Sequence, residues 1–162
     1  ITAVIGKESV MQYAQETFIS STFWTERIGP TAALKTLEVM EREKSWEKVS
    51  LQGEYLRKCI EELSKKYSLK IMFSGISAIL GFSFISSNNL VYKTFITQEM
   101  LKKGFLASNL TYVSIEHTNK VIDRYISNLD PIFKTISECE KSGDTKGLLE
   151  SDICHTGFNR LN

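Results

Sequence analysis

The chain has few of the side chains from which disulfide frameworks, metal centres and nucleophile pairs are usually built. It contains three cysteines and two histidines in 162 residues. Cys59, Cys139 and Cys154 are far apart, odd in number and in no paired spacing, which argues against a disulfide framework and against a zinc cluster. His155 adjoins Cys154, but adjacent side chains diverge and no further ligands are near, so we expect no metal site there. A reducing, cytoplasmic setting fits this cysteine usage best.

The chain also lacks an excess of either charge and an uninterrupted apolar run. Its 20 basic and 19 acidic residues leave a net charge of +1, so no strong field attracts nucleic acid, an anionic membrane or an acidic partner. The apolar stretch between Leu69 and Ile85 is interrupted by Lys70 and by small residues, so we expect two adjacent strands there instead of a membrane span. With 42% hydrophobic residues, the chain can bury one core or two small lobes and should be soluble and globular.

The order of hydrophobic patterns predicts an α/β chain whose middle helices link two lobes. The opening stretch, Ile1–Gly6, is typical of a buried strand and has no initiator methionine or signal peptide before it, so we expect the chain to start in mid-domain. The first half should then contain a short helix, a polar and aromatic loop, a helix started by Pro30 and a second helix of the same period. These elements are expected at residues 8–15, at 18–26, from Thr31, and at 49–67.

The second half should alternate short strands with helices. Short apolar runs separated by small residues predict strands, and Gly104 predicts the end of a helix. Pro131 should either kink the last helix or restart it after an Asp130 cap. The expected strands are residues 71–73, 78–85, 105–107 and 112–115, and the expected helices are residues 92–103 and a last one from Thr118 with Val121, Ile122, Tyr125, Ile126 and Leu129 inward.

Two places hold residues that suit chemistry. The loop from Phe18 to Pro30 combines hydroxyls, aromatic rings and charge before a helix. Backbone N–H groups and a hydroxyl can hold a phosphate there, and Phe23 or Trp24 can line a pocket, with a plain interface loop as the alternative. His117 follows the last expected strand, where it is either a polar residue satisfied at a strand-to-helix junction or a general acid-base group.

Two stretches carry a resemblance to a known family. The first runs from Ile1-Thr2-Ala3-Val4-Ile5-Gly6-Lys7 through Ser21-Thr22 to Ile28-Gly29-Pro30-Thr31-Ala32-Ala33-Leu34. The second is Tyr112-Val113-Ser114-Ile115-Glu116-His117-Thr118, with Ile122-Asp123 shortly after. Together they resemble class-III aminotransferases that depend on pyridoxal 5'-phosphate (PLP), in the branch related to glutamate-1-semialdehyde 2,1-aminomutase.

The resemblance implies the C-terminal part of a PLP-dependent transferase (aspartate-aminotransferase-like) fold. Residues 1–45 would form the end of the cofactor-binding large domain and the start of the linking helix, and residues 46–162 a small α/β domain that covers the substrate pocket. In the family, the threonine that matches Thr22, with Ser21 before it, binds the cofactor phosphate across a dimer interface. The implied cofactor is PLP, the substrate a small amino compound, and the assembly a homodimer with active sites at its interface.

The resemblance also implies what this chain does not supply. The family's Schiff-base lysine is expected upstream of Ile1, so Lys7 is not that residue, no catalytic residue is assigned here, and the chain alone should be inactive. Phe23 and Trp24 stand where the aminomutase has small residues, which favours an aminotransferase. An aminomutase, a non-catalytic dimerisation module derived from the family, and an unrelated α/β binding domain are the alternatives.

Overall fold

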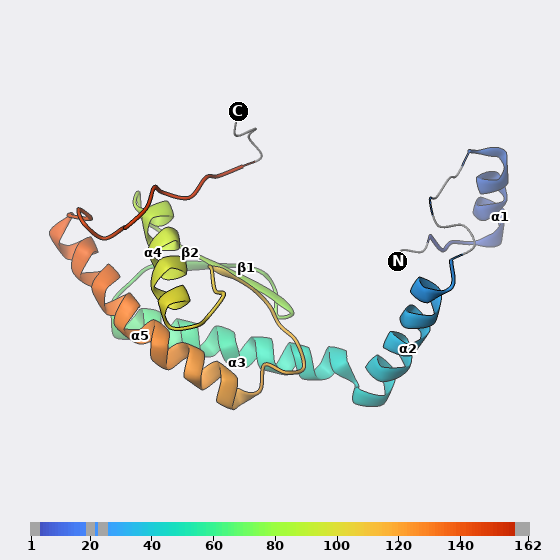
Figure 1. Cartoon of the computed structure of the whole chain (residues 1–162), viewed down its shortest axis with the longest axis horizontal. Coiled ribbons are helices and arrows are strands. Elements are labelled where there is room, and N and C mark those ends of the chain that lie inside the picture. Colours follow the sequence, from blue (N-terminus) through green and yellow to red (C-terminus); the bar gives the residue numbers. More distant parts are fainter. Residues whose placement is uncertain (1–3, 19–21, 23–25, 158–162) are drawn as a thin grey trace. The chain divides into compact units, whose positions relative to one another are not determined.

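A computed structural model of the protein describes residues 4–18, 22 and 26–157. The chain divides into two compact units, unit 1 with residues 1–45 and unit 2 with residues 46–162 (Figure 1). The assignment of these units to the end of a large domain and to a small domain stays a prediction. Within the described ranges, no helix combines the length and the apolarity that crossing a membrane requires.

Unit 1 has a short helical segment near its start and no described strand. Helix α1 (Glu8–Met11) continues into the 3-10 helix η1 (Gln12–Glu16), which confirms the helix predicted for residues 8–15. The predicted opening strand is wrong for the described residues 4–6, which have no strand structure, and Val4 and Ile5 are 84% and 91% exposed. A strand needs neighbours to pair its N–H and C=O groups, and no other strand lies in the described part of unit 1.

Helix α2 (Ile28–Glu43) begins before Pro30, where the sequence predicts its start. Pro30 is compatible with the earlier start because the N–H groups of a helix's first turn have no intrahelical acceptor. The helix ends where Lys44 adopts left-handed backbone angles, with φ of 48°. Its predicted apolar period is present, but Leu34 and Leu37 are 70% and 60% exposed, so this face is not packed within unit 1.

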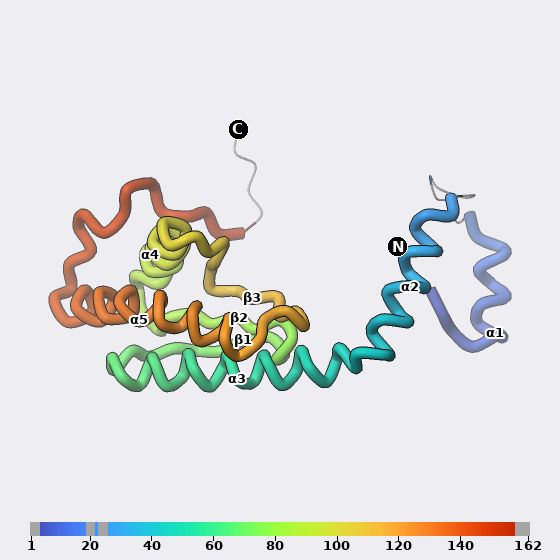
Figure 2. Tube along the Cα trace, turned by 60° about the horizontal axis from the view of Figure 1, so that its bottom comes forward, coloured from blue at the N-terminus to red at the C-terminus, as the bar shows by residue number. Residues whose placement is uncertain are grey.

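Unit 2, in its described residues, is a three-stranded antiparallel sheet with helices packed on one face. In chain order it contains α3 (Ser45–Lys66), β1 (Ile71–Ile76), β2 (Ile79–Phe84), α4 (Asn89–Lys102), β3 (Leu110–Tyr112) and α5 (Asn119–Ser142). The strand order is β1-β2-β3, and Figure 2 shows α3 running lengthwise beside the strands. The predicted strand pair between Leu69 and Ile85 and the predicted helices of this unit are confirmed.

The core lies between the helices and the inner face of the sheet. Phe133 of α5 packs against Phe84 of β2 with ring centroids 5.5 Å apart, and Phe84 packs against Tyr92 of α4 at the same distance. This aromatic cluster joins α4, α5 and β2. The largest fully buried side chains are Tyr92, Phe133, Ile60, Leu80, Ile96, Met100, Leu129 and Ile136.

Helix α3 approaches the β1–β2 hairpin very closely at Gly53. A Cβ atom at this position would lie 1.9 Å from the carbonyl oxygen of Ser77, which is in the hairpin turn. A side chain of any size would therefore push the hairpin away from α3. The glycine fixes where the hairpin sits on the helix.

The strand predicted for residues 105–107 is wrong. Gly104 has a left-handed φ of 80°, and the Phe105 N–H donates to the carbonyl oxygen of Met100 at 2.9 Å. This is the hydrogen bond of a glycine-terminated helix end, so the backbone of Phe105 belongs to the end of α4. Leu106, which follows, is 98% exposed.

The strand predicted for residues 112–115 is displaced toward the N-terminus, since β3 spans Leu110–Tyr112. The Val113 N–H still donates to the carbonyl oxygen of Ala78, but the chain then turns, and the His117 N–H donates to the Ser114 carbonyl at 3.0 Å. This turn leads into α5 and prevents the strand from continuing.

Helix α5 runs without interruption through Pro131, so of the two effects expected of this proline the restart is wrong, and the kink stays a prediction. The Asp130 carboxylate does not cap a new helix, because it accepts hydrogen bonds from Lys66 Nζ at 2.6 Å and from the Tyr67 hydroxyl at 3.2 Å. These bonds tie α5 to the end of α3. Val121, expected inward, is 42% exposed, whereas Ile122 is buried as predicted.

Candidate functional site

Thr22 is the predicted phosphate-binding residue that the structure describes. It lies at a bend between η1 and α2 and is exposed. Ser21, Phe23 and Trp24, which the sequence places in the same candidate site, lie outside the described residues. An exposed hydroxyl can donate a hydrogen bond to a phosphate oxygen. The role of Ser21 and Thr22 in phosphate binding therefore stays a prediction, to which the exposure of Thr22 is favourable.

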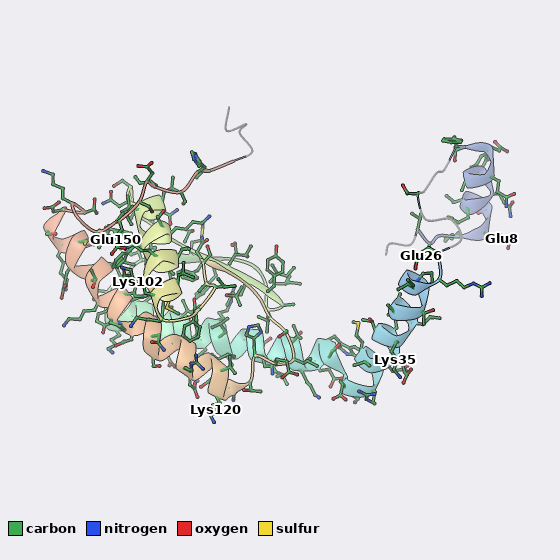
Figure 3. The ribbon with its side chains drawn as sticks, in the orientation of Figure 1. Glu8, Glu26, Lys35, Lys102, Lys120 and Glu150 are labelled. Carbon is green, nitrogen blue, oxygen red and sulfur yellow. The ribbon has the colours of Figure 1, made fainter. Side chains whose placement is uncertain are left out.

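The N-terminus of α2 already has an anionic group. The Gly29 N–H donates to both carboxylate oxygens of Glu26, each at 2.9 Å, and Glu26 lies at the start of α2 (Figure 3). A carboxylate is favourable at this end of a helix because the free N–H groups and the helix dipole carry partial positive charge. The Gly29 N–H, one of the first-turn groups that could bind a phosphate, is therefore hydrogen-bonded to the Glu26 side chain.

Two basic residues flank the first turns of α2. Arg27 and Lys35 line a shallow depression together with Ile28, Thr31 and Ala32. The Lys35 ammonium lies 2.7 Å from a carboxylate oxygen of Glu38. Arg27 adds positive charge next to the loop that contains Thr22, which suits an anionic group. For a PLP phosphate, the fit of unit 1 thus depends on the Thr22 hydroxyl and on this positive charge.

His117 makes a local contact at the junction between β3 and α5. Its ring Nδ1 accepts a hydrogen bond from the Ser114 N–H at 2.8 Å, and the Ser114 hydroxyl lies 3.0 Å from the same nitrogen. Because Nδ1 is an acceptor here, the neutral ring has its proton on Nε2. This contact supports the interpretation of His117 as a polar residue satisfied at the junction.

His117 also borders a hollow in unit 2 that the sequence did not reveal. The hollow has a volume of about 390 Å³, and its walls come from α3, residues 105–107, β3 and α5. Most of the lining is apolar, and Thr111 and Tyr125 add polar atoms. Among the described residues the Tyr125 hydroxyl is buried without a hydrogen-bond partner, and burial raises the pKa of this phenol to about 12. The size is that of a small-molecule pocket.

Replacing Tyr125 by phenylalanine should leave the free energy of unfolding unchanged or raise it by up to about 1 kcal/mol, because a buried polar group is removed and no hydrogen bond is lost. Tyr92→Phe is the matched control. The Tyr92 hydroxyl donates to a Glu140 carboxylate oxygen at 2.6 Å, so its loss should cost about 1.5–3 kcal/mol. Urea unfolding of both variants measures the two effects. A clear loss of stability in Tyr125→Phe would show that its hydroxyl has a partner.

The other polar clusters of unit 2 connect structural elements. The Tyr55 hydroxyl donates to Asp123 at 2.7 Å and joins α3 to α5. The Lys102 ammonium lies 2.6 Å from Glu150 and attaches the C-terminal segment to α4, as Figure 3 shows. The Cys154 N–H donates to the Thr94 hydroxyl at 3.0 Å, which attaches the same segment at a second point. In residues 4–18, 22 and 26–157, no three His, Cys, Asp or Glu side chains are grouped so that they could hold a metal ion.

Comparisons with known proteins find no matching family model, but they find similar single proteins. The 3-aminobutyryl-CoA aminotransferase of Cloacimonas acidaminovorans (strain Evry) is 30% identical over 99 residues, which are 60% of this chain and 24% of that protein. The 2'-deamino-2'-hydroxyneamine transaminase of Streptomyces kanamyceticus is 23% identical over 134 residues, 80% of this chain and 34% of that protein. A solved structure, the PLP internal aldimine form of the Sphingopyxis sp. MTA144 FumI protein, matches with a TM-score of 0.73 and 19% identity, covering 85% of this chain and 34% of that one.

The structural match confirms the predicted fold class. The chain has an α/β fold that it shares with one part of a protein solved with PLP, and at 19% identity this similarity concerns the fold alone. Both similar sequences are named as transaminases. The chain spans about a quarter to a third of the length of these relatives.

Proposed function

We propose that this chain is part of a PLP-dependent aminotransferase that transfers an amino group between small amino compounds. The observation that carries the proposal is the similarity to a protein named as an aminotransferase, 30% identical over 99 residues, and the fold match to a protein solved with PLP is consistent with it. The transaminase names of the two similar sequences support the same reaction class. The class-III type, with residues 1–45 ending a large domain and residues 46–162 forming the small domain, is supported by the motif around Ser21-Thr22.

Bound PLP supplies an electron sink for the carbon that carries the amino group. The part of this chain in that chemistry is binding and enclosure. The Thr22 hydroxyl donates one hydrogen bond to the cofactor phosphate of a neighbouring subunit, with Ser21 beside it, and Arg27 adds positive charge nearby. Unit 2 covers the substrate pocket and keeps water out. The Schiff-base lysine comes from outside residues 1–162, and the working protein is a cytoplasmic homodimer.

Replacing Thr22 by alanine in the complete protein should weaken PLP binding about tenfold or more, because a hydrogen bond to a charged acceptor contributes about 1.5–3 kcal/mol. The melting temperature of the apoprotein should not change, since Thr22 is exposed and its hydroxyl is not a core group. Equilibrium dialysis of PLP and thermal unfolding of the same preparation separate the two effects.

Two matched variants make this test specific. Thr22→Ser keeps the hydroxyl and should keep most of the affinity for PLP. Thr17→Ala removes a nearby hydroxyl that donates to the Ala14 carbonyl at 3.0 Å and should leave PLP binding unchanged. A PLP dissociation constant that is the same in Thr22→Ala as in the natural protein rejects the phosphate role.

A further inference from the structure

The sheet of unit 2 has two apolar faces, and the helices cover one of them. The inner face contains Ile71, Phe73, Leu80, Phe82, Phe84 and Thr111. The register places a second set on the outer face, with Met72 opposite Ser83, Ile76 opposite Ile79, and Ile79 opposite Tyr112. Leu110 lies on the same face because it pairs with Gly81, and Ile85 continues it beyond the end of β2.

The outer face is open to solvent in this structure. Met72 is 59% exposed, Ile76 67%, and Tyr112 68%. Ile85, Leu110 and Ile79 are also exposed, and the other outer positions of the paired strands are serines and a glycine. The exposed Lys70, whose carbonyl accepts from the Ile85 N–H, adds one charged residue at the edge of this face. When one face of an antiparallel sheet is solvated, apolar and polar residues normally alternate along its strands. In this sheet both faces have large apolar residues, which proteins usually bury.

The exposed apolar surface has the size and character of an interface. Six large side chains at these exposures amount to about 600 Å², which reaches the upper end for the largest patch on a typical monomer and approaches one partner's share of a standard interface. The outer positions of the paired strands have no charged side chain, and charged residues are depleted in the same way in interface cores. Unit 1 by itself also exposes large apolar side chains: Ile28 is 81% exposed, Val4 84% and Ile5 91%.

We infer that the outer face of this sheet, which includes Met72, Ile76 and Tyr112, is an interface buried by the rest of a transaminase-length protein. The inference rests on the proposed function. The similar transaminases contain three to four times the length that this chain spans, because the matches cover 34% and 24% of them. A polypeptide of that additional length offers enough surface to bury an apolar face of this area, and a mainly apolar partner surface is the chemistry that fits it.

Methionine oxidation tests the inference, because the chain contains an exposed and a buried methionine in the same unit. Met72 is 59% exposed on the outer face, and Met100 is fully buried in the core. The 162-residue chain and the protein expressed from its complete natural coding sequence are treated with hydrogen peroxide, and the sulfoxide at each position is followed by peptide mass spectrometry. Met72 should oxidise at least tenfold more slowly in the complete protein, and Met100 should be slow in both.

Three other outcomes have separate meanings. If Met72 reacts equally fast in both proteins, or if the complete coding sequence yields only these 162 residues as a monomer with reactive Met72, the face is open and the inference is wrong. If Met72 is protected in the 162-residue chain and the protection disappears on dilution, a second copy covers the face, and this outcome also overturns the inference.

The PLP content of the same complete protein is measured in parallel. If Met72 is protected and the complete protein contains no PLP, the interface is supported and the proposed function is rejected. If Met72 is reactive and the complete protein contains PLP, only the interface is rejected.

Discussion

Replacing Phe133 by alanine should lower the free energy of unfolding of unit 2 by about 3–5 kcal/mol, the cost of removing a large aromatic side chain from a packed core. Phe133 is fully buried, and its ring centroid lies 5.5 Å from that of Phe84 and 6.1 Å from that of Phe82. The substitution removes these ring contacts and leaves a cavity where α5 meets the sheet. Because a small domain is stable by only about 5–15 kcal/mol, a loss of this size should leave the unit close to unfolding.

Leu101→Ala in α4 is the control for this substitution. Leu101 is 57% exposed, so its truncation creates no closed cavity and should cost less than about 1 kcal/mol. Urea unfolding followed by circular dichroism gives both values. If the two variants lose similar stability, Phe133 is not the centre of a closed core, and the packing of α5 on the sheet is wrong.

Most of the elements of unit 2 follow from local sequence patterns. The period of Leu56, Ile60 and Leu63 predicts α3, and these three residues are buried. The run from Ile71 to Phe84 predicts the hairpin because small residues interrupt it where the chain must turn. Such signals lie within a few residues of the element they predict, which is why they succeed.

The failures depend on contacts that a local pattern does not contain. Val4 and Ile5 have the composition of a strand, but a strand forms only beside another strand, and the described part of unit 1 has none. Phe105 has the composition of a strand as well, but its N–H completes the helix end at Gly104. Asp130 precedes a proline as a cap would, yet Lys66, far away in sequence, binds its carboxylate.

In the candidate site, too, local sequence signals identified some residues, and contacts between distant segments were missed. The sequence selected Thr22 and His117, and the structure places both at exposed or half-buried junctions between elements. The bond from Gly29 to Glu26 had a detectable signal, an acidic residue three positions before a first-turn N–H. The hollow beside Tyr125 had none, because its walls come from α3, β3 and α5 and meet only in the folded unit.

Borohydride reduction of the complete protein with PLP tests most directly whether this chain is part of a PLP-dependent aminotransferase. Reduction makes the bond between a lysine and the cofactor permanent, so peptide mapping identifies the lysine. We expect one pyridoxyl-lysine, on a peptide outside residues 1–162, and no defined adduct when the 162-residue chain alone is mixed with PLP. Lys7→Arg in the complete protein should not change the labelling. No label in the complete protein would contradict the proposed function, whereas a single stable label at Lys7 or at another lysine of this chain would contradict the placement of the Schiff-base lysine outside residues 1–162.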